Sequence, residues 1–127
     1  MAQRNGDAPA GLKKEALERL ARALDVKKNR DAGRLGDVQS EIKALDQERC
    51  DLEARLAHAH IDLDPASLTD SLALEKWRNA TKARLVGLGE QRVELEKIVV
   101  ERRRVLARSN GEVEALRRLL GSTRRRT

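Results

Sequence analysis

Apolar residues recur at alternating steps of three and four through the second half of the chain. The run comprises Leu85, Leu88, Leu95, Val99, Leu106, Val113, Leu116 and Leu120, with Arg92, Arg102 and Ser109 at the remaining positions of the same frame. Such steps place residues on one face of an α-helix, and their sustained alternation is typical of a coiled-coil seam. Carried backwards, the frame passes through Thr81, then Arg78 or Trp77, then Leu74.

The first half of the chain carries the same pattern in two runs. One run comprises Leu17, Leu20 and Leu24, and the other comprises Leu35, Val38, Ile42, Leu45, Arg49, Leu52, Leu56 and Ala59. Eleven residues separate Leu24 from Leu35, where an unbroken heptad pattern needs about 7 or 14. Such a four-residue stutter locally unwinds a supercoil, and Lys28 with Asp31 or Ala32 bridges it.

The two prolines mark expected helix starts. Asp7 and Pro9 suit the cap and the first turn of a helix, where the missing N–H of proline costs nothing. Asp64 and Pro65 repeat this arrangement, and Ser67, with an acidic residue three positions on, is a competing cap. Both starts for the second helix remain open.

The expected boundaries follow from these signals. Gly121 suits the left-handed residue that ends a helix. We expect helix one at about 8–60, a turn at about 61–66, helix two at about 66–120 and a frayed basic tail at 121–127.

A short connection between two helices of similar length favours antiparallel packing, which buries both seams. The predicted fold is therefore all-α, a long antiparallel two-helix coiled-coil hairpin that forms a single unit over residues 1–127. With the turn centred near Asp64, facing positions sum to about 127. Leu20 would then lie near Leu106.

Four glycines are interior to the helical pattern: Gly33, Gly36, Gly87 and Gly89. Each costs about 1 kcal/mol relative to alanine. Either the helices approach closely at these positions or the hairpin is soft there. We prefer softness, because the stutter lies nearby.

The composition agrees with a linear core. Phe and Tyr are absent, Trp occurs once, and charged residues (38%) nearly equal apolar residues (39%). A narrow leucine and valine seam needs no aromatic residue, whereas a sizeable globular core does. No apolar run approaches the roughly 18 residues of a membrane span, and the first ten residues contain no apolar signal core, so we expect a cytoplasmic protein without membrane insertion.

No motif specifies a reaction, a cofactor or a metal. His58 and His60 are two residues apart, which does not place them on one helix face, and no second pair completes a site. Cys50 lies beside the seam, where a half-buried, unreactive thiol is expected. We therefore predict a protein that is not an enzyme and has no catalytic residue, cofactor or metal site.

The net charge of +6 is concentrated near the end of the chain, where 10 Lys/Arg face 3 Asp/Glu from Lys97 onward. The candidate partner-binding residues in this region are Arg102, Arg103, Arg104, Arg108, Arg117 and Arg118. Phosphate contacts need only positive charge, so nucleic acid is one possible partner. We prefer an acidic protein or a solvated face, because single-strand binders also need stacking aromatics near the basic residues.

Trp77 is the remaining candidate. It lies near the turn and beside the seam, where packing against Leu45, Arg49 or Cys50 is one interpretation. Tryptophan is also a favoured interface anchor, so a partner contact is the other.

The segments LERLARALDVKKNRDA, LALEKWRNA and ERRRVLARSNGEVEALRRLLGSTRRR, on either side of a mid-chain turn, give the chain a layout that resembles the bacterial FliJ/YscO family. These are stalk proteins of flagellar and other type III export systems. The resemblance implies an antiparallel coiled coil that binds a hexameric export ATPase, and also the export gate or export chaperones. It further implies that the basic face meets the ATPase and that the turn end around Trp77 meets the gate or a chaperone.

Three hypotheses about function remain. The first is a non-enzymatic coiled-coil adaptor, an export stalk of flagellar biosynthesis or type III secretion that acts in protein transport. The second is a basic coiled-coil protein that binds nucleic acid in a nucleoid or a phage. The third is a helical chaperone or scaffold whose seam opens at the stutter to accept a partner helix.

Overall fold

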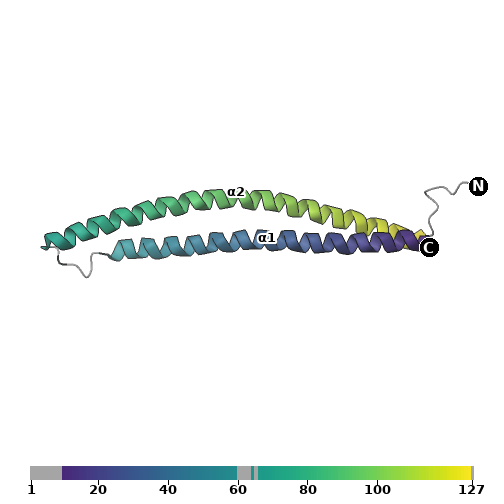
Figure 1. Ribbon diagram of the computed structural model, residues 1–127, viewed down its shortest axis with the longest axis horizontal. Helices are drawn as coiled ribbons and strands as arrows, with labels where there is room; N and C mark the ends of the chain where they lie inside the picture. Colours follow the sequence, from purple (N-terminus) through teal and green to yellow (C-terminus); the bar gives the residue numbers. More distant parts are fainter. Residues whose placement is uncertain (1–9, 60–63, 65, 127) are drawn as a thin grey trace, which may run out of the picture. The chain divides into compact units, whose positions relative to one another are not determined.

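The computed structural model describes residues 10–59, 64 and 66–126. It contains helix α1 (Ala10–His58) followed by helix α2 (Leu68–Arg126), as Figure 1 shows. The all-α two-helix hairpin is confirmed. The predicted signals at Asp7, Pro9 and Pro65 lie outside the described residues.

The start of α2 is capped by Ser67. Its Oγ accepts a hydrogen bond from the backbone N–H of Asp70 at 3.2 Å, as expected of an N-cap. Asp64 instead forms the preceding turn, where its Oδ1 accepts a bond from the N–H of Ala66 at 2.9 Å. Of the two starts that the sequence left open, the structure therefore selects Ser67.

Helix α2 does not end at Gly121. It continues to Arg126, and no described glycine has a positive φ, so the expected frayed tail at 121–127 is wrong as far as Arg126. Glycine also adopts the helical conformation at a cost of about 1 kcal/mol, and arginine is a good helix former. The arginines beyond Gly121 therefore extend the helix.

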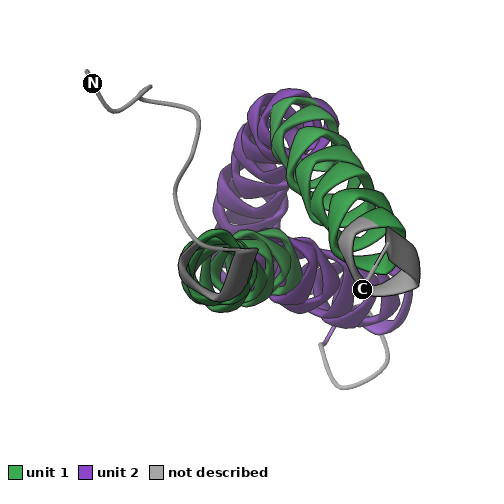
Figure 2. Cartoon of the chain, turned by 90° about the vertical axis from the view of Figure 1, so that its right-hand side faces the viewer, with its two compact units in different colours: residues 1–36, 101–127 green, residues 37–100 purple. Residues whose placement is uncertain are grey.

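The chain forms two compact units, distinguished by colour in Figure 2. Unit 1 combines residues 1–36 with 101–127, and unit 2 consists of residues 37–100. Each unit pairs one stretch of α1 with one stretch of α2.

The core of both units is the predicted seam. Every buried hydrophobic residue lies in the expected frame: Val38, Leu88, Val99, Val113, Leu116 and Leu120. Leu88, at 1% exposure, is the most buried of them. Burial at steps of three and four confirms the coiled-coil pattern.

The structure decides two polar positions of the predicted seam. Arg49 is exposed and pairs with Glu53 at 3.1 Å, so its placement in the seam is wrong. Its guanidinium stays hydrated outside the seam, because burial of an unpaired charge is costly. Ten residues after the start of α2, Arg78 is half-buried and Trp77 is 36% exposed, so Arg78 occupies the seam position left open between them.

The stutter in α1 is occupied by a buried polar pair in unit 1. Asp31 is 5% exposed and Ser109 of α2 is 1% exposed. The Ser109 hydroxyl donates a hydrogen bond to the Asp31 carboxylate. Ala32, the alternative bridging residue, is exposed.

The register between the helices differs from the predicted one. In unit 1 Asp31 faces Ser109, so facing positions sum to 140 instead of 127. In unit 2 Glu48 pairs with Arg84 at 2.9 Å and Asp46 pairs with Arg92 at 3.3 Å, which gives sums of 132 and 138. Leu20 is accordingly exposed and is not a seam partner of Leu106. In unit 2 the pairing of the helices shifts because α2 begins six residues before the position that lies beside the last residue of α1. His58, the last residue of α1, shares a groove with Leu74, six residues into α2 from Leu68.

The interior glycines are not required by close packing. A Cβ placed on any of the four would have no side chain or neighbouring-helix atom within 4 Å, and all have helical backbones. Close approach of the helices is therefore not their cause. Softness at these positions stays a prediction.

Gly33→Ala should stabilise the protein by about 0.5–1 kcal/mol, because alanine loses less backbone entropy in a helix and its Cβ meets nothing. Urea unfolding followed by circular dichroism measures the change. The neighbouring exposed Ala32→Gly is the matched control and should destabilise by a similar amount. A loss of stability in Gly33→Ala would contradict the model of an unconstrained glycine.

Ser109→Ala should cost about 1–3 kcal/mol, because it leaves the buried Asp31 carboxylate without its hydroxyl donor. The double variant Asp31→Leu with Ser109→Ala should recover most of this loss, since it removes both polar groups. Exposed Ser40→Ala serves as the control and should change little. Equal stability of Ser109→Ala and the wild type would refute the buried pair.

Candidate functional site

The two units carry opposite net charge. Residues 1–36 and 101–127 contain 18 Lys/Arg against 8 Asp/Glu, whereas residues 37–100 contain 9 against 13. The net charge of +6 is thus +10 in unit 1 and −4 in unit 2. A surface of this sign in unit 1 attracts anionic partners over about a Debye length, roughly 8 Å at physiological salt.

Two of the predicted arginines are engaged within the chain. Arg102 is half-buried in the seam, and its Nη1 donates a hydrogen bond to the backbone carbonyl of Arg34. Arg117 reaches Asp25 of α1 at 3.7 Å and Glu114 at 3.6 Å. Arg102 therefore contributes to the packing of unit 1, whereas the ion pairs of Arg117, whose side chain is 57% exposed, are weak.

The other four predicted arginines are exposed on α2, and we call Arg103, Arg104, Arg108 and Arg118 the basic surface. Arg104, Arg108 and Arg118 are spaced by 4 and 10 residues, which places them on one side of the helix, away from the seam. Arg104 lies 3.4 Å from Glu101, but both side chains are about two-thirds exposed, so this pair is weak.

The remaining members of the basic surface are unpaired. Within the described part of the chain, Arg103, Arg108 and Arg118 have no ion pair. Four long cations without an internal role or a strong partner remain available to an external anionic group.

Sequence reasoning missed the contribution of α1 to this unit. Lys14, Arg22, Lys28 and Arg30 also make no ion pair among the described residues. These cations were overlooked because Lys/Arg and Asp/Glu balance over the first half of the chain as a whole. Counting Lys/Arg and Asp/Glu in shorter windows would have revealed 9 against 5 over residues 1–36.

Trp77 belongs to unit 2 and lines a groove near the end of α1. The groove has a volume of about 490 Å³, and its lining comprises Arg55, His58, Ala59, Ala73, Leu74 and Trp77. We call it the Trp77 groove. None of the three residues proposed as packing partners, Leu45, Arg49 and Cys50, lines it. The indole therefore combines partial packing with an accessible face.

Two leucines near the start of α2 are exposed as well. Leu68 and Leu72, in the first turns of α2, are 74% and 58% exposed. They precede Leu74, which shares the groove with the last turn of α1. These leucines and Trp77 together offer apolar area at this end of unit 2.

The cysteine and histidine candidates form no catalytic or metal site among the described residues. Cys50 is exposed, so the expectation of a half-buried thiol is wrong, and His60 lies outside the described residues. Over residues 10–59, 64 and 66–126 no group of three or more His, Cys, Asp or Glu is placed to hold a metal ion. Neither described helix contains a stretch apolar and long enough to cross a membrane.

Comparison with known protein families, curated proteins and solved structures gave no match.

Arg102→Ala should destabilise the protein by about 0.5–1.5 kcal/mol, because it removes a hydrogen bond to the Arg34 carbonyl and methylene packing in the seam. Arg103→Ala, its exposed and unpaired neighbour, is the control and should stay within about 0.5 kcal/mol of the wild type. Thermal unfolding of both variants measures the difference. Equal effects would show that the two arginines have the same role.

Proposed function

We propose that this protein is a coiled-coil adaptor that binds other proteins, as a stalk of a type III or flagellar export apparatus does. The observation that carries the proposal is the basic surface: exposed arginines with no strong internal partner on a two-helix hairpin. Acidic protein surfaces are the partners that such a surface recognises.

The resemblance to the FliJ/YscO family gives this partner a class. In that family the basic face meets a hexameric export ATPase, and the turn end meets the export gate or an export chaperone. The basic surface in unit 1 and the Trp77 groove in unit 2 supply one candidate contact of each kind. The separation of charge between the units supports distinct partners for each.

The basic surface is tested with the triple variant Arg103→Glu, Arg104→Glu and Arg108→Glu. The full-length protein should capture the export ATPase of the same organism, and the triple variant should lose at least tenfold in affinity, because attraction becomes repulsion. Surface plasmon resonance at two salt concentrations measures both values. Raising the salt should weaken the wild-type complex.

The matched control is a triple variant in unit 2 with the same change in net charge. Lys43, Lys76 and Lys82 are exposed in unit 2 and have no ion pair among the described residues, so their replacement by Glu changes only overall charge. It should reduce affinity less than about threefold. Equal loss in both triple variants, or no ATPase binding by the wild type, would contradict the proposal.

Nucleic acid is the alternative that the same surface favours, since unpaired arginines also contact phosphates. Fluorescence anisotropy with a labelled DNA duplex distinguishes the two. The adaptor proposal expects no saturable binding at physiological salt. Submicromolar DNA binding that the Arg103, Arg104 and Arg108 triple variant abolishes would replace it.

A further inference from the structure

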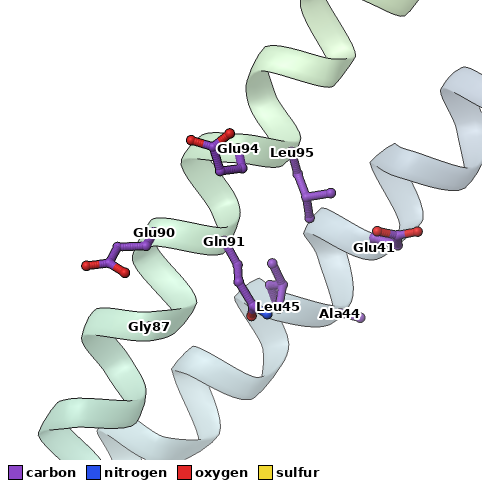
Figure 3. A pocket seen from close by; sticks show the side chains of 8 residues that line it. All are labelled: Glu41, Ala44, Leu45, Gly87, Glu90, Gln91, Glu94 and Leu95. Carbon is purple, nitrogen blue, oxygen red and sulfur yellow. The ribbon is translucent and has the colours of Figure 1, made fainter.

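A second groove lies along unit 2, between α1 and α2, on a side that the proposed function does not use. Its volume is about 550 Å³, and its lining comprises Glu41, Ala44, Leu45, Gly87, Glu90, Gln91, Glu94 and Leu95. We call it the acidic groove. In Figure 3 Leu45, Gln91 and Leu95 lie between the two helices, and Gly87 adds no side chain beside them.

Carboxylates flank the apolar floor on both sides. Glu90 and Glu94 project from α2, and Glu41 projects from α1 on the opposite side (Figure 3). No lysine, arginine or histidine lines this groove. Glu41 and Glu90 have no ion pair among the described residues, whereas Glu94 pairs with the exposed Lys97 at 3.0 Å.

Gly87 makes the groove open. It is interior to α2, where glycine costs about 1 kcal/mol relative to alanine, and a Cβ there would meet no atom within 4 Å. The fold of unit 2 therefore does not require glycine at this position. Any larger side chain would occupy the groove, since Gly87 is one of its walls.

Apolar surface continues beyond the groove along α2. Ile98 is 40% exposed and lies three residues after Leu95 and seven after Gln91, which places it on the same side of the helix. The apolar strip thus extends for about three helical turns past Gly87. An extended apolar strip between acidic flanks is complementary to a helix with an apolar face flanked by cations.

We propose that the acidic groove binds an amphipathic helix of a partner protein, with aliphatic residues on Leu45 and Leu95 and with Lys or Arg flanking them. The cations of that helix would pair with Glu41 on one side and Glu90 on the other. The same charges exclude acidic helices by repulsion. This site shares no residue with the basic surface, so the proposal does not depend on the proposed export partner.

The probe is a labelled synthetic peptide with leucine at i, i+3, i+4 and i+7 and lysine at the remaining positions. A comparison peptide has glutamate in place of lysine. Fluorescence anisotropy with the full chain should give saturable binding of the lysine peptide and at least tenfold weaker binding of the glutamate peptide. Similar affinity for both peptides would overturn the charge selection, and no binding of the lysine peptide would overturn the site.

Two variants assign the binding to the groove. Glu41→Lys with Glu90→Lys reverses the flanks and should weaken binding of the lysine peptide at least tenfold. Glu53→Lys with Glu75→Lys makes the same charge change on exposed positions of unit 2 outside the groove and should weaken it less than threefold. Equal losses in these double variants would mean nonspecific attraction and would overturn the proposal.

Gly87→Leu tests the floor without changing charge. It should weaken binding of the lysine peptide at least fivefold, while its thermal midpoint stays at or above the wild-type value, because leucine favours the helix. Gly33→Leu, whose Cβ position is equally open but lies in unit 1, is the control and should bind like the wild type. Unchanged binding by Gly87→Leu would overturn the proposal.

A second copy of the chain is the other possible occupant, and sedimentation of the free protein tests it. A single species of monomer mass supports a separate partner helix. A dimer that dissociates in the Glu41→Lys, Glu90→Lys variant would overturn that proposal in favour of self-association.

Discussion

The fold depends on one constraint: each of two paired helices can bury only a narrow stripe of its surface. The buried hydrophobic residues, such as Leu88 in unit 2 and Val113 in unit 1, all lie on that stripe. Most charged side chains outside the seam are exposed, so their charge has no role in the core. This is why a chain with 38% charged residues and one aromatic residue forms a stable pair of helices, and why its arginines remain available.

The seam also determines which charges become neighbours. The Asp31–Ser109 pair links the α1 and α2 segments of unit 1 at a position where an apolar pair would tolerate sliding. A buried polar residue in a coiled coil specifies register at some cost in stability, and we assign that role to this pair. The hairpin brings two segments of net positive charge, 1–36 and 101–127, into one unit and leaves the segment of net negative charge, 37–100, in the other.

The helices and the seam were predictable because the spacing of apolar residues along the chain specifies which helix face is buried. Register was not, since a seam that repeats every seven residues matches itself after a shift of whole heptads. In unit 1 the predicted sum of 127 and the sum of 140 for Asp31 and Ser109 differ by 13, close to two heptads, so the seam pattern alone does not distinguish these two registers. The polar contact that distinguishes them cannot be recognised before the partner is known.

The candidate sites were predictable only in part. The exposed arginines were identifiable from their clustering, but the engagement of Arg102 and Arg117 depends on α1 residues that the wrong register placed elsewhere. The acidic groove had no signal at all. Gly87 and Ala44 carry no functional group that a sequence pattern could identify. They contribute to the groove only through their small size.

The most direct test of this account is a thiol cross-linking measurement in a Cys50→Ser background. Asp31→Cys with Ser109→Cys should link rapidly within one molecule when treated with a short bifunctional thiol reagent, because these positions are in contact in unit 1. Leu20→Cys with Leu106→Cys, the pair expected from the sum near 127, should link slowly. Links between two molecules, or faster linking of the Leu20 and Leu106 pair, would contradict the hairpin and its register.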